Sequence, residues 1–113
     1  MSLLAELNAL AEDIGIPVET GVFTGTAPDE YLVLTPLSDS FAFHADDCPQ
    51  YDVQEIRISL YAKGSYVEGK NQIVRALLAA DVSITDRRFI SHEDDTGYFH
   101  YAIDVAKSYE MEV

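Results

Sequence analysis

The stretch Tyr51-Asp-Val-Gln-Glu-Ile-Arg-Ile-Ser-Leu-Tyr-Ala-Lys63 decides the fold of this chain. Apolar residues at positions 56, 58, 60 and 62 alternate with polar or amphipathic residues at 55, 57, 59 and 61. This period of two is typical of a strand that buries one face. A strand over 51–63 would span about 40 Å, which is longer than most strands. We therefore expect its far end to project beyond the core or to pair with another subunit.

An amphipathic helix is predicted to follow this strand and to pack against it. Ser65 and Glu68 have the spacing of a capping box, which predicts that the helix begins at Tyr66 or Val67. Gly69 lies inside the helical pattern and should weaken the helix by about 1 kcal/mol relative to alanine. The apolar stripe recurs at three- and four-residue spacing and consists of Val67, Ile73, Val74, Ala76, Leu77 and Ala80.

The rest of the chain predicts one further helix and several strands around this pair. The helix covers residues 3–14, with Ser2 as its cap and Gly15 as its left-handed terminator. Strands are predicted over 18–23, 31–35, 41–45, 82–90 and 98–109, with Leu37–Ser40 as a turn between the second and third. We therefore predict a single α+β domain over residues 1–113. Two helices pack on one face of a mainly antiparallel sheet, in the order α-β-β-β-β-α-β-β.

Composition and charge limit the classes of function. The single cysteine, Cys48, excludes an internal disulfide, and no apolar run is long enough to span a bilayer. The net charge of −13 argues against specific DNA binding and against adhesion to anionic membranes. An acidic surface suits a basic partner, or a surface past which nucleic acid must slide, or serves solubility alone.

The motifs of common enzymes and metal sites are missing from this sequence. Acidic residues, histidine and cysteine gather at 44–48 and again at 92–95, but neither cluster has a recognised ligand spacing. The acidic neighbours of Cys48 disfavour a thiolate, and His100 falls on a predicted strand, where a packed histidine is the commoner case. Gly64–Asn71 partly resembles a phosphate loop, but the capping box explains this segment better. We therefore predict no enzyme activity, no metal and no cofactor.

Several segments in order resemble one family. Leu10–Phe23, Ala27–Asp29, Tyr31–Leu34 and Tyr51–Lys63 are similar to small tail-terminator and tail-completion (head-tail joining) proteins of long-tailed bacteriophages and prophages. The shared pattern is a leading helix, Gly-Ile-Pro-Val, a loop with proline before an apolar strand, and a long strand. With the following helix and terminal hairpin, the likeness covers nearly the whole chain.

The resemblance implies a structural role without catalytic residues. Subunits of that family form a ring, usually hexameric, that caps the tail tube and joins it to the head connector. The implied partners are copies of this chain, the major tail protein and head connector proteins, while DNA passes without specific binding. The implied location is the virion tail, after synthesis in the bacterial cytoplasm. The candidate residues at a subunit interface or facing the channel are Tyr61, Lys63, Glu93, Asp94, Asp95 and Tyr98.

Two other hypotheses remain open at this point. The chain could be a small acidic accessory protein, an inhibitor or adaptor that acts on a basic partner. It could also be an enzyme with an unrecognised site, which would require His44, His100 and Cys48 to converge. Among the tyrosines, Tyr31 and Tyr109 join Tyr61 and Tyr98 as candidates for a protein interface, where tyrosine is favoured.

Overall fold

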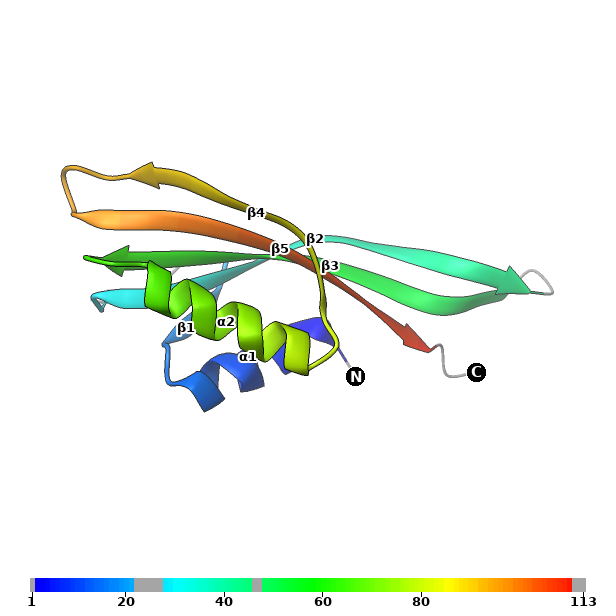
Figure 1. The fold of residues 1–113 in the computed structure, drawn as a ribbon. Coiled ribbons are helices and arrows are strands. Elements are labelled where there is room, and N and C mark those ends of the chain that lie inside the picture. Colours follow the sequence, from blue (N-terminus) through cyan, green and yellow to red (C-terminus); the bar gives the residue numbers. More distant parts are fainter. Residues whose placement is uncertain (1, 22–27, 46–47, 111–113) are drawn as a thin grey trace.

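The chain folds into two helices packed on one face of a sheet (Figure 1). A computed structural model describes the backbone of residues 2–21, 28–45 and 48–110, and the side chains of these residues outside 40–50. The elements are α1 (Leu3–Ile14), β1 (Val18–Thr20), β2 (Glu30–Ala45), β3 (Cys48–Lys63), α2 (Val67–Ala79), β4 (Ser83–His92) and β5 (Tyr98–Glu110). Over these residues the sheet has the strand order β1-β2-β3-β5-β4, and only the β1–β2 pair is parallel. The predicted α+β class is confirmed.

Both ends of the first helix lie at the predicted residues. The Ser2 hydroxyl oxygen accepts a hydrogen bond from the Ala5 amide at 3.2 Å. At the other end Gly15 adopts φ +80°, and its amide donates to carbonyls of the last turn. Because glycine has no Cβ, it takes this left-handed conformation at little cost.

The second helix begins at Val67, as predicted, but the capping box is wrong. The N-cap residue is Tyr66, and no side chain caps the helix. The Ser65 hydroxyl accepts instead from the Val67 amide at 3.4 Å. The ring of Tyr66 stacks on Tyr101 of β5 at 5.5 Å, and the N-cap position falls on this packed residue, one residue after the Ser65 of the predicted box.

The strand β2 is longer than the sequence indicates. The predicted strands at 31–35 and 41–45 are parts of one strand, and the turn predicted at Leu37–Ser40 is wrong. The ladder with β3 continues through this region, with a register shift between Pro36 and Ser38. The β1 ladder ends at Leu34, so among the described residues Pro36 lies on an open edge, where its missing N–H removes no ladder hydrogen bond.

The core lies between the helices and one face of the sheet. The predicted inward face of β3, at positions 56, 58, 60 and 62, is at most 3 % exposed. The residues that pack against it include Leu3, Leu7 and Ala11 of α1, Ile73 and Leu77 of α2, and Tyr101, Ile103 and Val105 of β5. The alternating apolar face of the strand and the apolar stripes of the two helices therefore pack into one core.

The end of the β2–β3 hairpin projects beyond the helices (Figure 1). The molecule measures 54 × 24 × 24 Å, and β3 alone, at roughly 3.3 Å per residue, accounts for the long axis. Within the described residues, the strand β5 accompanies β3 as far as the pair Tyr51–Glu110. Beyond that pair β2 and β3 continue as a two-stranded ribbon. We call this two-stranded part, residues 42–45 of β2 and 48–50 of β3, the arm.

The long strand has no free edge of its own over residues 51–63. It pairs with β2 on one side and with β5 on the other along this whole stretch. Of the two expectations for the long strand, projection beyond the core therefore holds, and direct pairing of its backbone with another subunit does not. In the described part of the sheet, the open edges belong to β1 and β4, to β2 beyond Leu34, and to β3 before Tyr51.

Candidate subunit interface

Three of the six candidate residues meet on the sheet face that carries no helix. Tyr61 of β3 and Tyr98 of β5 approach edge to face, with ring centroids 6.4 Å apart. The Nζ atom of Lys63 lies 5.0 Å from the centre of the Tyr98 ring. This contact is a cation–π interaction, of the kind that an exposed lysine makes on a tyrosine.

The same face carries a continuous row of aromatic rings, which we call the tyrosine cluster: Tyr31, Tyr61, Tyr98 and His100. Tyr61 stacks between Tyr31, at 5.0 Å, and His100, at 4.3 Å. The register makes this row, because Tyr31 and His100 are the cross-strand partners of Tyr61. The Tyr98 hydroxyl donates to the Pro28 carbonyl at 2.7 Å, which ties the cluster to the start of β2.

Tyr31, Tyr61 and His100 of the tyrosine cluster are uncharged near neutral pH. Burial raises the pKa of Tyr31 and Tyr61, and the nearby Glu93 carboxylate adds to the effect. Burial also lowers the pKa of His100, because it disfavours the imidazolium ion. The Nε2 atom of His100 is buried and has no hydrogen-bond partner among the described residues. Half-buried neutral aromatic groups of this kind are common in protein interfaces.

The three acidic candidates form the turn between β4 and β5. The Glu93 amide donates to the Tyr98 carbonyl at 2.8 Å, and the Gly97 amide donates to the Glu93 carbonyl at 2.7 Å. The Asp94 side chain is 95 % exposed and contacts His92 at 3.1 Å, and Asp95 is also exposed. This turn lies at the end of the sheet away from the arm (Figure 1). All six candidate residues therefore gather at one end of the molecule.

An ion pair lies between the tyrosine cluster and the arm. Arg57 donates from Nε and from its terminal nitrogen to the two carboxylate oxygens of Asp104, at 2.8 and 3.1 Å. These hydrogen bonds lower the pKa of Asp104 and raise that of Arg57. The pair is partly exposed, so the helix-free face is aromatic at one end and polar in its middle.

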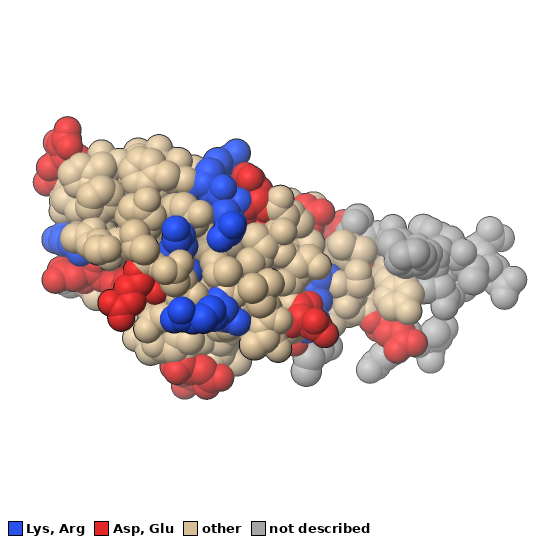
Figure 2. All heavy atoms as spheres, in the orientation of Figure 1, with Lys and Arg blue, Asp and Glu red and all other residues tan. Residues whose placement is uncertain are grey.

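The negative charge of the chain is spread unevenly. On the face in Figure 2, lysine and arginine lie mainly over the middle of the body, with some at one margin, and acidic side chains lie mainly around its margins and ends. The acidic turn after β4 is one of these ends. Charge on this face is therefore not a single acidic patch.

The catalytic candidates do not converge. His44 and Cys48 belong to the far end of the arm, while His100 pairs with Tyr61 near the opposite end of β3. Tyr61 lies thirteen positions after Cys48 in β3, which is about 43 Å along the strand. The side chains of the 44–48 cluster lie outside the described residues. Among the residues that the structure does describe, no group of three potential ligands is close enough to hold a metal ion.

Comparison with known proteins adds no relative. The chain matches no protein-family model and no curated protein. Over the residues that the structure describes, neither helix is long and apolar enough to cross a membrane.

The sequence predicted most of the residues on this surface as interface candidates, but it did not predict that they form one cluster. Tyr61 and Tyr98 were candidates for contact with another subunit, and Tyr31 for a protein interface. The fourth interface candidate, Tyr109, lies elsewhere and donates its hydroxyl hydrogen bond to Glu6 of α1. His100 lies two residues after Tyr98 on the same strand, so the two side chains are on the same face of the sheet. The sequence could have indicated this, but only if it were known which face the helices cover.

Proposed function

We propose that this chain is a ring-forming structural subunit of the tail-terminator kind, which caps a phage or prophage tail tube and joins it to the head. The arm is the observation that carries this proposal. An isolated two-stranded ribbon is marginally stable in water, and it needs a third strand or another layer to persist. Neither helix reaches the arm in Figure 1, so a neighbouring subunit is the natural source of that layer.

The arm also offers an open edge. Beyond Leu34 the outer side of β2 pairs with no strand in the described part of the chain. Unpaired N–H and C=O groups along such an edge attract another strand or an interacting surface. A structural subunit can use this edge in assembly, whereas a protein that stays monomeric has to protect it.

The two ends of the molecule suit a head-to-tail contact. The arm forms one end, and the tyrosine cluster lies near the other end, on the helix-free face. A contact between two different surfaces of identical subunits generates a ring when the rotation closes. The acidic turn at Glu93–Asp95 stands beside the tyrosine cluster. If it faces the channel, like-charge repulsion lets DNA pass without being held.

Electron microscopy of the purified protein tests this proposal. Wild-type protein at high concentration should give closed rings and a matching mass in solution. The matched variant replaces residues 40–53 with Asn-Gly, a sequence that favours a tight hairpin turn. The pair Asp39–Gln54 is kept because the Gln54 side chain accepts a hydrogen bond from the Leu3 amide at 2.8 Å.

The shortened variant should fold as the wild type does and should remain monomeric. A wild-type protein that stays monomeric at every concentration contradicts the proposal. Rings that survive the shortening would show that the arm is not the contact. Genes for tape-measure and major tail proteins beside this gene would support the tail assignment independently.

A second function is favoured by a different observation. An apolar groove with acidic side chains lies between the two helices, away from the tyrosine cluster. A small acidic adaptor or inhibitor that acts on a basic partner would use such a groove. Absence of rings, together with tight binding of one basic protein, would favour this alternative.

A further inference from the structure

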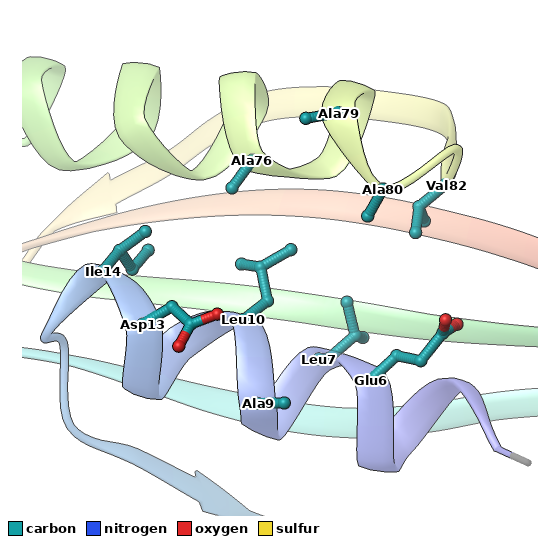
Figure 3. A pocket seen from close by; sticks show the side chains of 10 residues that line it. All are labelled: Glu6, Leu7, Ala9, Leu10, Asp13, Ile14, Ala76, Ala79, Ala80 and Val82. Carbon is teal, nitrogen blue, oxygen red and sulfur yellow. The ribbon is translucent and has the colours of Figure 1, made fainter.

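The two helices leave a groove between them on the outside of the molecule (Figure 3). Its volume is about 430 Å³, which is within the range of ligand pockets and large enough for roughly two or three apolar side chains. The lining residues are Glu6, Leu7, Ala9, Leu10, Asp13 and Ile14 of α1, and Ala76, Ala79, Ala80 and Val82 of and after α2.

Small side chains keep the groove open. Ala76 and Ala80 point from α2 toward Leu10 and Ile14 of α1 across the gap (Figure 3). A leucine in place of either alanine would reach across much of this space. Leu10 and Ile14 are only partly buried although they pack against the core. The groove therefore leaves apolar surface in contact with water that a partner could cover.

The charges of the lining are all of one sign. Glu6 and Asp13 are seven residues apart on α1, so they stand two turns, or about 10.5 Å, from each other along one side of the helix. Glu6 already accepts hydrogen bonds from Lys107, at 3.1 Å, and from Tyr109. Asp13 is exposed and has no ion-pair partner among the described residues. A partner would therefore gain most by bringing a positive charge to Asp13.

A second copy of this chain fits this requirement poorly. Each copy has a net charge of −13, and α1 contains no basic residue. A membrane surface fits poorly too, because anionic lipids would be repelled. A helix with an apolar stripe and basic flanks supplies both of the missing components, and helices commonly bind in apolar grooves through residues at i, i+3, i+4 and i+7.

We propose that the groove between α1 and α2 binds a basic amphipathic helix from another protein. The apolar stripe of that helix occupies the gap beside Ala76, and a lysine or arginine on its flank pairs with Asp13. This inference rests on the second candidate function, which it deepens by naming the class of partner. It is compatible with the proposed ring, since the groove lies on the helices and the arm lies beyond them.

A synthetic helical peptide tests the inference. The probe carries leucine at i, i+3, i+4 and i+7 with lysine on both flanks, and a second peptide has glutamate in place of each lysine. Binding is followed by ¹⁵N chemical-shift changes at near-physiological salt. The lysine peptide should shift the amides around Leu10 and Ala76, and the glutamate peptide should bind at least about tenfold more weakly.

Matched variants separate groove binding from general attraction to an acidic protein. Asp13→Lys should weaken binding about fivefold, the scale of one partly exposed charge contact. Glu12→Lys makes the same charge change at a neighbouring residue that does not line the groove, and it should alter the affinity less than about twofold. Ala76→Leu should fill the gap and abolish binding, while Ala5→Leu, at an exposed position outside the groove, should not.

Three outcomes would overturn the inference. They are shift changes that map away from the groove, equal effects of Asp13→Lys and Glu12→Lys, and groove shifts that appear with protein concentration alone. The last outcome would assign the groove to a second copy. The arm-shortened protein retains the groove and should bind the peptide with wild-type affinity. The experiments can therefore reject the proposed ring without rejecting peptide binding in the groove, and the reverse.

Discussion

At the scale of single residues, His100 combines burial with an unused hydrogen-bonding atom. Its ring stacks on Tyr61 at 4.3 Å, and its Nε2 atom has no partner among the described residues. A buried polar atom without a partner costs about 1–3 kcal/mol of stability. The groups that influence its charge are Glu93, which favours the imidazolium ion, and Arg57, which opposes it. Burial is the largest effect, and it keeps the ring neutral.

We expect His100→Phe to raise the free energy of unfolding by about 1 kcal/mol at pH 7.5, because the unsatisfied nitrogen is removed. The free energy of unfolding of this variant should also depend less on pH than that of the wild type. The unfolded chain takes up a proton on His100 near pH 6.5, whereas the folded protein resists it, since burial lowers the pKa. Wild-type stability should therefore fall as the pH drops below about 6.5 toward the folded pKa.

Urea unfolding from pH 7.5 to pH 5 measures this difference, in a range above the ordinary titration of most carboxylates. The wild-type curve should slope downward toward low pH, and the His100→Phe curve should be flatter. Equal slopes for the two proteins would mean that solvent reaches the imidazole in the folded state.

At the scale of elements, α2 shows why an unfavourable residue can be retained in a helix. Gly69 lies in the first turn of α2 and faces the sheet. A Cβ atom at this position would stand 2.6 Å from a carboxylate oxygen of Glu30 and 3.6 Å from a methyl carbon of Leu60. The glycine therefore makes room for the Glu30 side chain. The close neighbour is the far end of a flexible side chain, so that end has freedom to move.

We expect Gly69→Ala to raise the free energy of unfolding by about 0.5 kcal/mol, since the helix gains about 1 kcal/mol and displacement of Glu30 offsets part of it. When Glu30→Ala is already present, Gly69→Ala should raise the free energy of unfolding by about 1 kcal/mol. Chemical denaturation of the four proteins of this cycle measures both values. If Gly69→Ala loses stability and Glu30→Ala does not restore it, the added methyl group clashes with Leu60 and not with Glu30.

At the scale of the whole molecule, like charge opposes assembly. Every subunit brings a net charge of −13 to the proposed ring, and charges on different copies repel over the screening length of the solution. The proposed contacts between subunits, the arm and the tyrosine cluster, are backbone groups and neutral aromatic rings. Salt should therefore weaken the repulsion more than it weakens the contacts.

We expect rings to form at lower protein concentration when the ionic strength rises from about 0.02 M to about 0.3 M, which shortens the screening length about fourfold. Sedimentation velocity over a concentration series at both salt levels measures the shift. Assembly that weakens with salt would mean that opposite charges, such as Arg87 or Arg88 against an acidic turn, hold the subunits together.

The local patterns of the sequence were sufficient for much of the fold. The boundaries of α1 followed from Ser2 and Gly15, because a cap and a left-handed terminator act on backbone groups a few residues away. The inward face of β3 followed from alternation alone. The sequence named Tyr31, Tyr61 and Tyr98 as interface candidates, but it did not include His100 and could not distinguish these tyrosines from ordinary sheet surface.

Contacts between distant residues decided what these patterns left open. Leu37–Ser40 has the composition of a turn, but its register with β3 makes it a strand. Ser65 and Glu68 have the spacing of a capping box, but the N-cap residue is Tyr66, which packs on Tyr101. By itself the sequence determined the boundaries of α1 and the buried face of β3, because those preferences act within a turn or along a strand, whereas Val67 of the predicted apolar stripe of α2 is exposed. Only the tertiary structure decided the arm, the tyrosine cluster and the groove, because each depends on which strands pair and how far apart two helices lie.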